Sequence, residues 1–192
     1  MNLFADHNVN LTILKQKAYN FRWATLEDDV IPLTAADPDF RVSEYITDAI
    51  NKYVKDGYFS YCPAEGLPEF RNGIADWYKR KYSVDTNPAY ILPTNSAASG
   101  LFICAKSILN RGDNAIIPNP VDFLFRKSIE YAGAEVRTSS VNKVNGEFDL
   151  ADIESLIDAN TKAIFICNPN NPLGKSLSKQ HLKAIIELAI KN

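Results

Sequence analysis

Three asparagines in the stretch NPNNPLGKS, residues 168–176, are well suited to binding a ligand through hydrogen bonds. The stretch follows an apolar run at 162–167, and its two prolines cannot continue a buried strand because proline lacks a backbone donor. Asn168, Asn170 and Asn171 are therefore expected at the tip of a strand. A carboxamide there could donate a neutral hydrogen bond to a ring oxygen. The alternative is a turn stabilised by Asn side chains, although two Asn-Pro breaks are more than a turn needs.

A second candidate is the stretch PTNSAASG, residues 93–100, where an apolar run meets a predicted helix. The small residues Ser96, Ala97 and Ala98 let a ligand approach the backbone, and a helix start offers unpaired N–H groups with partial positive charge. This combination predicts an anion site, with phosphate as the expected anion. The alternative is a helix start that is simply well capped. The glycine patterns of dinucleotide-binding and P-loop proteins do not occur in this sequence.

An alternation of apolar runs and amphipathic helices positions both stretches. Strands are predicted at 89–93, 115–118, 134–141 and 162–167, and helices at 96–110, 123–134, 149–159 and 178–192. This order indicates parallel strands with helical crossovers, and hence an α/β sheet. Ligands of such sheets bind at the carboxyl ends of the strands. Ser96 follows the first predicted strand and Asn171 the fourth, so one phosphate-bearing ligand could reach both.

Helices are also predicted outside this alternation. The segments 43–56 and 67–82 read as helices that precede the sheet, with the irregular aromatic segment 57–66 between them. In the helix at 96–110, hydrophobic residues recur on one face, which predicts that they belong to the core. These residues are Leu101, Cys104, Ala105, Ile108 and Leu109.

Composition argues against several classes of protein. With 192 residues, 46% hydrophobic and 23% charged, the sequence is typical of a globular protein. A net charge of −2 without a basic block argues against nucleic acid binding. With no apolar run of about 18 residues and no signal-peptide layout, we expect no membrane association and a cytoplasmic location. Three scattered cysteines and two histidines assemble neither a disulfide framework nor a metal site.

Four motifs, taken together, resemble one enzyme family. NPNNPLG at 168–174 resembles the N-P-x-N-P-[TS]-G signature of the class I/II aminotransferases, which are fold-type-I enzymes dependent on pyridoxal 5′-phosphate. The other three are similar to family motifs in the same order: LTAADPDF at 33–40, the segment 61–82 that begins YCPAEG, and LNRGDNAIIPNP at 109–120. The resemblance implies a three-layer large domain with a mostly parallel sheet. It also implies amino group transfer between an amino acid and a 2-oxo acid.

The resemblance implies roles for the residues singled out above. Ser96, Ala97 and Ala98 match the turn that binds the cofactor phosphate, which agrees with the predicted anion site. Asn171 matches the asparagine that hydrogen-bonds the cofactor's ring oxygen beside the substrate. Tyr61 matches a tyrosine that reaches the cofactor phosphate of the other subunit in a homodimer. Ala36 matches a loop glycine near the substrate carboxylate.

The sequence departs from the family pattern in the stretch NPVDFLF, residues 119–125. Asp122 occupies the position of an aromatic residue that stacks on the cofactor ring, and Phe123 or Phe125 is expected to replace that residue. Phe123 is assigned to the cofactor site on this ground. The loop AADPDF at 35–40 also resembles the cystathionine β-lyase-like branch, which leaves a carbon–sulfur lyase as an alternative reaction.

The family's Schiff-base lysine lies beyond the region that matches this sequence, and Lys175 does not replace it. The 192 residues alone are therefore expected to be inactive, and a non-catalytic phosphate-ligand binding fragment is a further alternative. We assign 1–42 to an N-terminal arm and part of the small domain, and 43–192 to the first half of the cofactor-binding domain. In this incomplete sheet, residues 90–92 should not pair with 164–167, and an open cleft should separate Ser96 from Asn171.

Overall fold

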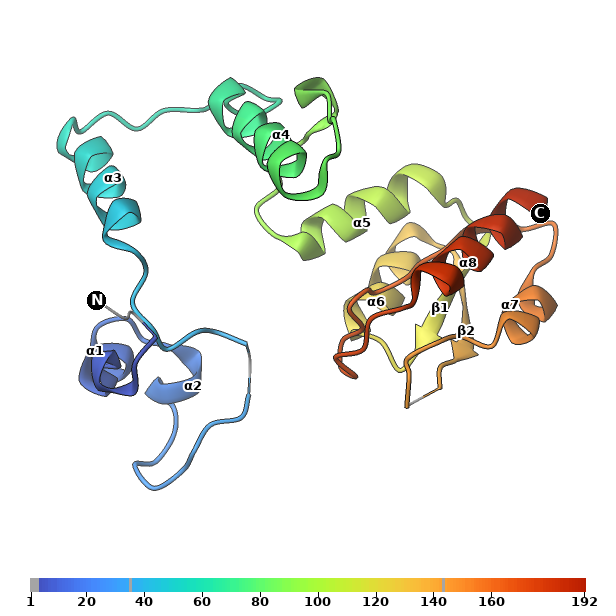
Figure 1. Cartoon of the computed structure of the whole chain (residues 1–192), viewed down its shortest axis with the longest axis horizontal. Helices are drawn as coiled ribbons and strands as arrows, with labels where there is room; N and C mark the ends of the chain where they lie inside the picture. Colours follow the sequence, from blue (N-terminus) through green and yellow to red (C-terminus); the bar gives the residue numbers. More distant parts are fainter. Residues whose placement is uncertain (1–3, 35, 143) are drawn as a thin grey trace. The chain divides into compact units, whose positions relative to one another are not determined.

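The computed structural model describes residues 4–34, 36–142 and 144–192. The chain forms two compact units, Met1–Cys62 and Pro63–Asn192 (Figure 1). The predicted boundary at residue 42 falls inside the first unit, and the assignment of 1–42 to a small domain stays a prediction. Among the described residues, no helix has the length and apolar character needed to cross a membrane.

The first unit consists of short helices and a long loop. Its helices are η1 (Asp6–Asn8), α1 (Leu11–Gln16), α2 (Phe21–Ala24) and α3 (Glu44–Lys55). The loop between α2 and α3 is tied back to α2 by two side chains. Arg22 Nη1 donates to the backbone oxygen of Asp37 at 2.6 Å, and Trp23 Nε1 donates to Asp39 Oδ1 at 2.9 Å. These bonds hold the loop that contains Ala36.

The second unit contains a three-stranded parallel sheet. Its elements are α4 (Pro68–Tyr82), η2 (Pro88–Tyr90), α5 (Ala97–Ile108), β1 (Asn114–Asn119), α6 (Phe123–Ala132), β2 (Glu135–Ser140), α7 (Leu150–Leu156), β3 (Thr161–Ile164) and α8 (Lys179–Lys191). The strand order is β2-β1-β3, and both pairings are parallel. The predicted α/β architecture is confirmed, with strands at three of the four expected places.

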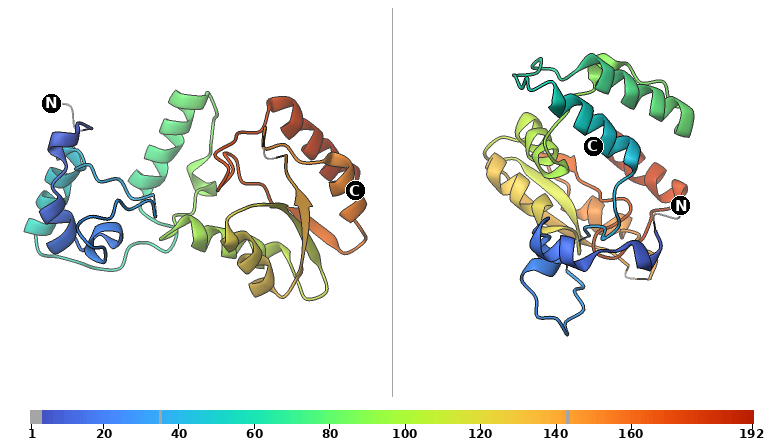
Figure 2. Two further views of the ribbon diagram at one scale, coloured as in Figure 1. Left: turned by 90° about the horizontal axis from the view of Figure 1, so that it is seen from below. Right: turned by 90° about the vertical axis from the view of Figure 1, so that its left-hand side faces the viewer.

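Helices cover both faces of this sheet because the side chains of β1 alternate. Ala115 and Ile117 lie in a core cluster with residues of α5, its C-cap and α6: Ala105, Leu109, Ile129 and Ala132. Ile116 points the other way, into a cluster with residues of α7 and α8: Ile153 and Ile185. Figure 1 shows α6, α7 and α8 around β1 and β2, and Figure 2 shows α7 and α8 side by side. The second unit therefore has three layers, as the resemblance implies.

The segment 89–93 is not a strand, which corrects the sequence-based expectation. Pro88–Tyr90 form a turn of 3-10 helix, in which Asn87 caps the Ala89 amide at 2.9 Å. Arg71 Nε of α4 donates to the backbone oxygen of Pro88 at 2.8 Å. An apolar segment becomes a strand only where a neighbour completes its hydrogen bonds, and the described strands provide none here. The expected lack of pairing between 90–92 and 164–167 is confirmed.

A polar network joins the strands at the amino end of the sheet. The buried Asn114 of β1 donates through Nδ2 to Asp158 Oδ1 at 2.9 Å. Arg137 Nη2 of β2 donates to Asp158 Oδ2 at 2.7 Å, and the Asn160 amide donates to Oδ1 at 2.9 Å. These bonds, led by that from Asn114, lower the pKa of Asp158 to about 2. The ionised carboxylate is thus the form that holds the loop before β3.

We expect Asp158→Asn to destabilise the chain at neutral pH and to flatten its acid unfolding profile. A lowered pKa contributes stability above the unfolded value near 3.8, and this contribution is lost as the pH falls toward about 2. Urea midpoints measured between pH 7 and pH 2 should therefore fall more for the wild type than for the variant. Asp29→Asn, at an exposed position of the first unit, is the control. Parallel profiles for the wild type and Asp158→Asn would refute this role.

Candidate functional site

The loops that follow β1 and β3 meet at the carboxyl end of the sheet. Asn170, only 6% exposed, links them through both ends of its side chain. Its Nδ2 donates to the backbone oxygen of Pro120 at 3.2 Å, and its Oδ1 accepts from the Leu173 amide at 3.1 Å. Cis peptide bonds in these loops precede Pro120, Pro169 and Pro172. Asn170 is therefore a structural residue between the two loops.

Replacing Asn170 by Ala should lower the free energy of unfolding by about 2 kcal/mol, because two part-buried backbone groups, the Pro120 oxygen and the Leu173 amide, lose their partner. Urea denaturation at neutral pH measures this loss. Asn145→Ala is a matched control, since Asn145 is exposed and its side-chain bonds to described residues stay within its own turn, to Glu147. We expect the control to change stability by less than about 0.5 kcal/mol. A similar small effect at both positions would contradict the structural role of Asn170.

The other two asparagines of this loop differ in role. Asn168 Oδ1 accepts from the Leu177 amide at 2.9 Å and so shapes the loop. Asn171 is exposed, and its Nδ2 donates to Asp122 Oδ2 at 2.9 Å. The backbone N–H of Asn171 donates to Cys167 Sγ at 3.4 Å. Of the three carboxamides expected at the strand tip, that of Asn171 remains available to a ligand.

The start of α5 combines a cap with free backbone donors. Ser96 Oγ accepts from the Ser99 amide at 3.1 Å and lies 3.0 Å from Ser99 Oγ. The Ala97 and Ala98 amides belong to the first turn, where an α-helix has no internal acceptor for its N–H groups. The capped helix and the anion site, weighed above as alternatives, are compatible because the cap uses a different amide.

One pocket brings the start of α5 together with Asn171. It has a volume of about 440 Å³, within the range of small-molecule sites. The residues that line this candidate pocket are Ala97, Ala98, Leu101, Asp122, Leu124, Phe125, Cys167 and Asn171. The predicted cleft between the Ser96 turn and Asn171 is confirmed. Backbone donors lie in its wall with one carboxamide and one carboxylate, and apolar side chains form the rest.

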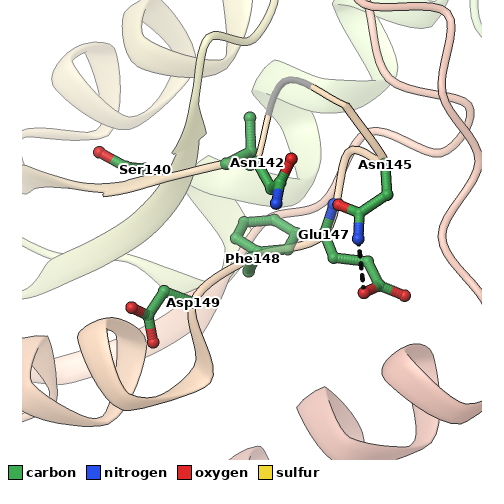
Figure 3. Close-up of a pocket in the computed structure, with 7 residues that line it drawn as sticks. Ser140, Asn142, Asn145, Glu147, Phe148 and Asp149 are labelled. Atoms are coloured by element: carbon green, nitrogen blue, oxygen red, sulfur yellow. Dashed lines mark hydrogen bonds between the residues drawn. The ribbon is translucent and has the colours of Figure 1, made fainter.

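A second pocket, of about 410 Å³, lies at the end of β2 (Figure 3). Polar side chains that line this second pocket already form hydrogen bonds with neighbouring residues of the chain. Asn145 Nδ2 donates to Glu147 Oε2 at 3.1 Å, and Asp149 Oδ1 caps α7 by accepting from the Ala151 amide at 3.0 Å. Asn142 Oδ1 accepts from the Val144 amide at 2.8 Å. We therefore place the candidate site in the first pocket.

Comparison with known proteins identifies the family. The model of the family described as aminotransferase class I and II matches residues 28–192. The chain belongs to this family. Its relatives include the aspartate aminotransferase of Pyrococcus horikoshii, which is 32% identical over 170 residues, 88% of this chain and 44% of the relative. The chain of this aminotransferase family member thus spans less than half the length of that protein.

Solved structures of aminotransferases also match the chain. The aspartate aminotransferase of Thermotoga maritima is 32% identical, with a TM-score of 0.80 over 85% of this chain and 44% of its own. A mutant of the Thermus thermophilus aspartate aminotransferase is 28% identical, with a TM-score of 0.77 over 83% of this chain and 42% of its own. The fold-type-I assignment made from the four motifs is therefore confirmed.

The two phenylalanines considered for ring stacking lie in different places in the second unit. Phe125 lines the candidate pocket and packs edge-on against Phe165, with ring centroids 6.4 Å apart. Phe123 is 63% exposed and lies under Lys127, whose Nζ is 5.1 Å from its ring centroid. Phe123 lines a separate hollow of about 190 Å³. Its stacking role stays a prediction, and the geometry favours Phe125.

The core assignment for α5 is partly wrong. Ala105 and Leu109 are buried as expected, but Cys104 and Ile108 are exposed. Leu101 lines the candidate pocket rather than the core. Leu101 lies one helical turn after Ala97, on the same face of α5. This spacing from the predicted anion site is the sequence signal that could have assigned Leu101 to the pocket.

Tyr61 and Ala36 lie in the first unit, and both side chains are exposed. Tyr61 is fully exposed, at 104% of its reference area. The roles of Tyr61 and Ala36 stay predictions.

Proposed function

We propose that the candidate pocket binds pyridoxal 5′-phosphate and that the protein containing this chain transfers an amino group between an amino acid and a 2-oxo acid. The observation that carries the proposal is the meeting of the α5 helix start and the Asn171 carboxamide in one pocket. Family membership and the aminotransferase activity for which the relatives are named support it. We also propose that the 192-residue chain alone binds the cofactor but does not catalyse amino group transfer.

The residues present fit the cofactor. The Ala97 and Ala98 amides, together with the helix dipole, would hold the phosphate, and their methyl side chains leave room for it. Asn171 Nδ2 carries two protons and donates one to Asp122, so the other is available for the ring oxygen. Leu101 and Phe125 would exclude water from the ring. The bound cofactor supplies the electron-withdrawing ring that stabilises charge at the substrate α-carbon.

Two further parts of the proposal concern the first unit. We place the backbone at Ala36 near the substrate carboxylate, and Tyr61 at the phosphate of a second subunit in a homodimer. The bonds from Arg22 to Asp37 and Asp39 support a defined loop conformation around Ala36. Sedimentation of the protein that contains this chain tests the homodimer, since an active monomer would remove the role of Tyr61. A cytoplasmic location is part of the same proposal.

Binding measurements on the 192-residue chain test the phosphate site. We expect pyridoxamine 5′-phosphate to bind at least about tenfold more tightly than pyridoxamine in calorimetric titrations, because only the former can use the α5 amides. Asn171→Ala should weaken binding of both compounds, since both carry the ring oxygen. Asn145→Ala, in the turn at the end of β2, is the matched control. Equal affinities for the two compounds would overturn the proposed site.

The reaction is tested with the protein that contains this chain. Transfer of the amino group from an amino acid to a 2-oxo acid supports the aminotransferase. Release of a thiol and pyruvate from a cysteine conjugate, without amino transfer, would favour the carbon–sulfur lyase instead. Binding of inorganic phosphate with no preference for the pyridine compounds would favour the phosphate-ligand binding fragment.

A further inference from the structure

Both carboxylate oxygens of Asp122 accept hydrogen bonds at the edge of the candidate pocket. Oδ1 accepts from the Leu124 amide at 2.9 Å and caps α6, and Oδ2 accepts from Asn171 Nδ2 at 2.9 Å. An ionised carboxylate can only accept hydrogen bonds, so the nitrogen end of the Asn171 carboxamide must face Asp122. The orientation of this carboxamide is therefore set by a residue 49 positions away in the sequence.

Asp122 and Asn171 place a carboxylate and a hydrogen-bond donor next to each other. Asn171 offers a proton, and Asp122 offers a negative charge that is half-buried and, among the described residues, forms no ion pair. Both residues line the same pocket. A ligand that satisfies both must carry an oxygen acceptor and, close beside it, a cationic donor.

We propose that Asp122 makes the pocket selective for the aminated form of the cofactor. Pyridoxamine 5′-phosphate carries a protonated aminomethyl group on the ring carbon next to the one that bears the oxygen. Its oxygen suits Asn171, and its ammonium group suits Asp122. A cofactor form without that cation leaves the Asp122 charge unpaired in the pocket, which is unfavourable. This inference rests on the proposed function and assigns Asp122 as a specificity-determining residue.

The test compares two ligands on the 192-residue chain at neutral pH. Pyridoxamine 5′-phosphate and 4-deoxypyridoxine 5′-phosphate differ by an ammonium group against a hydrogen, and neither has an aldehyde that could react with lysines. We expect the wild type to prefer pyridoxamine 5′-phosphate by about fivefold in calorimetric titrations, as for one partly exposed ion pair. Asp122→Asn should reduce this ratio to about one, because the charge is removed.

A second variant, Asp122→Ser, shows whether a loss of preference comes from the missing charge or from a folding defect. Asn and Ser both cap helices well, so Asp122→Asn and Asp122→Ser each keep a cap for α6. Ser is too short to reach Asn171, and we expect it to remove the preference as well. In the unliganded chain, the ¹⁵N-resolved side-chain amide protons of Asn171 should shift in both variants, because their bond to the carboxylate is lost.

The outcomes separate this inference from the proposed function. If both ligands bind the wild type but their ratio is the same in Asp122→Asn, the selectivity is refuted while the phosphate site stands. If both affinities fall in parallel, Asp122 acts only through the structure of the pocket, and the selectivity is likewise refuted. If neither ligand binds the wild type, the proposed function fails and the inference fails with it.

Discussion

Replacing Ala97 by Asp should lower the affinity for pyridoxamine 5′-phosphate by at least about 100-fold. A carboxylate in the first turn of α5 would lie in the wall of the candidate pocket and face the phosphate. Two unit charges about 4 Å apart repel by roughly 4 kcal/mol at the effective dielectric constant of a protein surface, and phosphate carries more than one charge. A factor of 100 corresponds to only about 2.7 kcal/mol.

The same substitution should leave the fold intact, which makes the result informative. An acidic residue in the first turn of a helix interacts favourably with the helix dipole, so the stability of α5 should be unchanged or slightly raised. Ala97→Asn is the matched control, because it adds nearly the same volume without charge. We expect calorimetry to show a much smaller loss of affinity for Asn than for Asp. Unchanged affinity in Ala97→Asp would show that the phosphate binds elsewhere.

Replacing Ile116 by Ala should lower the free energy of unfolding by about 3 to 4 kcal/mol. Ile116 is fully buried in β1, the central strand of the sheet, and its side chain lies in the cluster with Ile153 and Ile185. Removing three buried carbon atoms costs their transfer free energy and leaves a cavity that the surrounding helices fill only in part. The loss is a large fraction of the total stability of a typical domain.

Urea denaturation followed by circular dichroism measures this loss. Ile186→Ala is the matched control, because Ile186 neighbours Ile185 on α8 but is 57% exposed. We expect less than about 1 kcal/mol for the control. Since β1 leads directly into the loop that carries Asp122, Ile116→Ala should also weaken ligand binding at temperatures near its unfolding midpoint. Equal losses at the two positions would mean that the cluster around Ile116 is not the core described above.

Local patterns in the sequence determined most elements of the second unit. The segments near 115, 136 and 163 became β1, β2 and β3, because each is short, contains β-branched residues and is separated from the next by a helix. Helix ends followed local chemistry in the same way. Ser96 and Ser178 cap α5 and α8 through their own hydroxyl groups, and Gly133 ends α6 with a φ of 89°. Such contacts involve neighbours in the chain, so residue type and spacing suffice to predict them.

Other features depended on contacts between distant residues. The segment 89–93 has the composition of a strand, but a strand exists only where another backbone pairs with it. Phe123 and Phe125 are both apolar, and the orientation of α6 on the sheet decides that Phe125 faces the pocket. Residues two apart on a helix point about 200° apart, so only one of them can do so.

Contacts between distant residues also decide the separate roles of the three asparagines that follow β3. Their residue type and their place after a strand are visible in the sequence, which therefore predicted a cluster of carboxamides at the sheet edge. Their separate roles were not visible, because Asn170 is buried by the loop at Pro120 and Asn171 is oriented by Asp122. Both partners come from the segment after β1, about 50 residues earlier. The sequence thus determined which residues could form the site, and packing of the two loops decided which of them face a ligand.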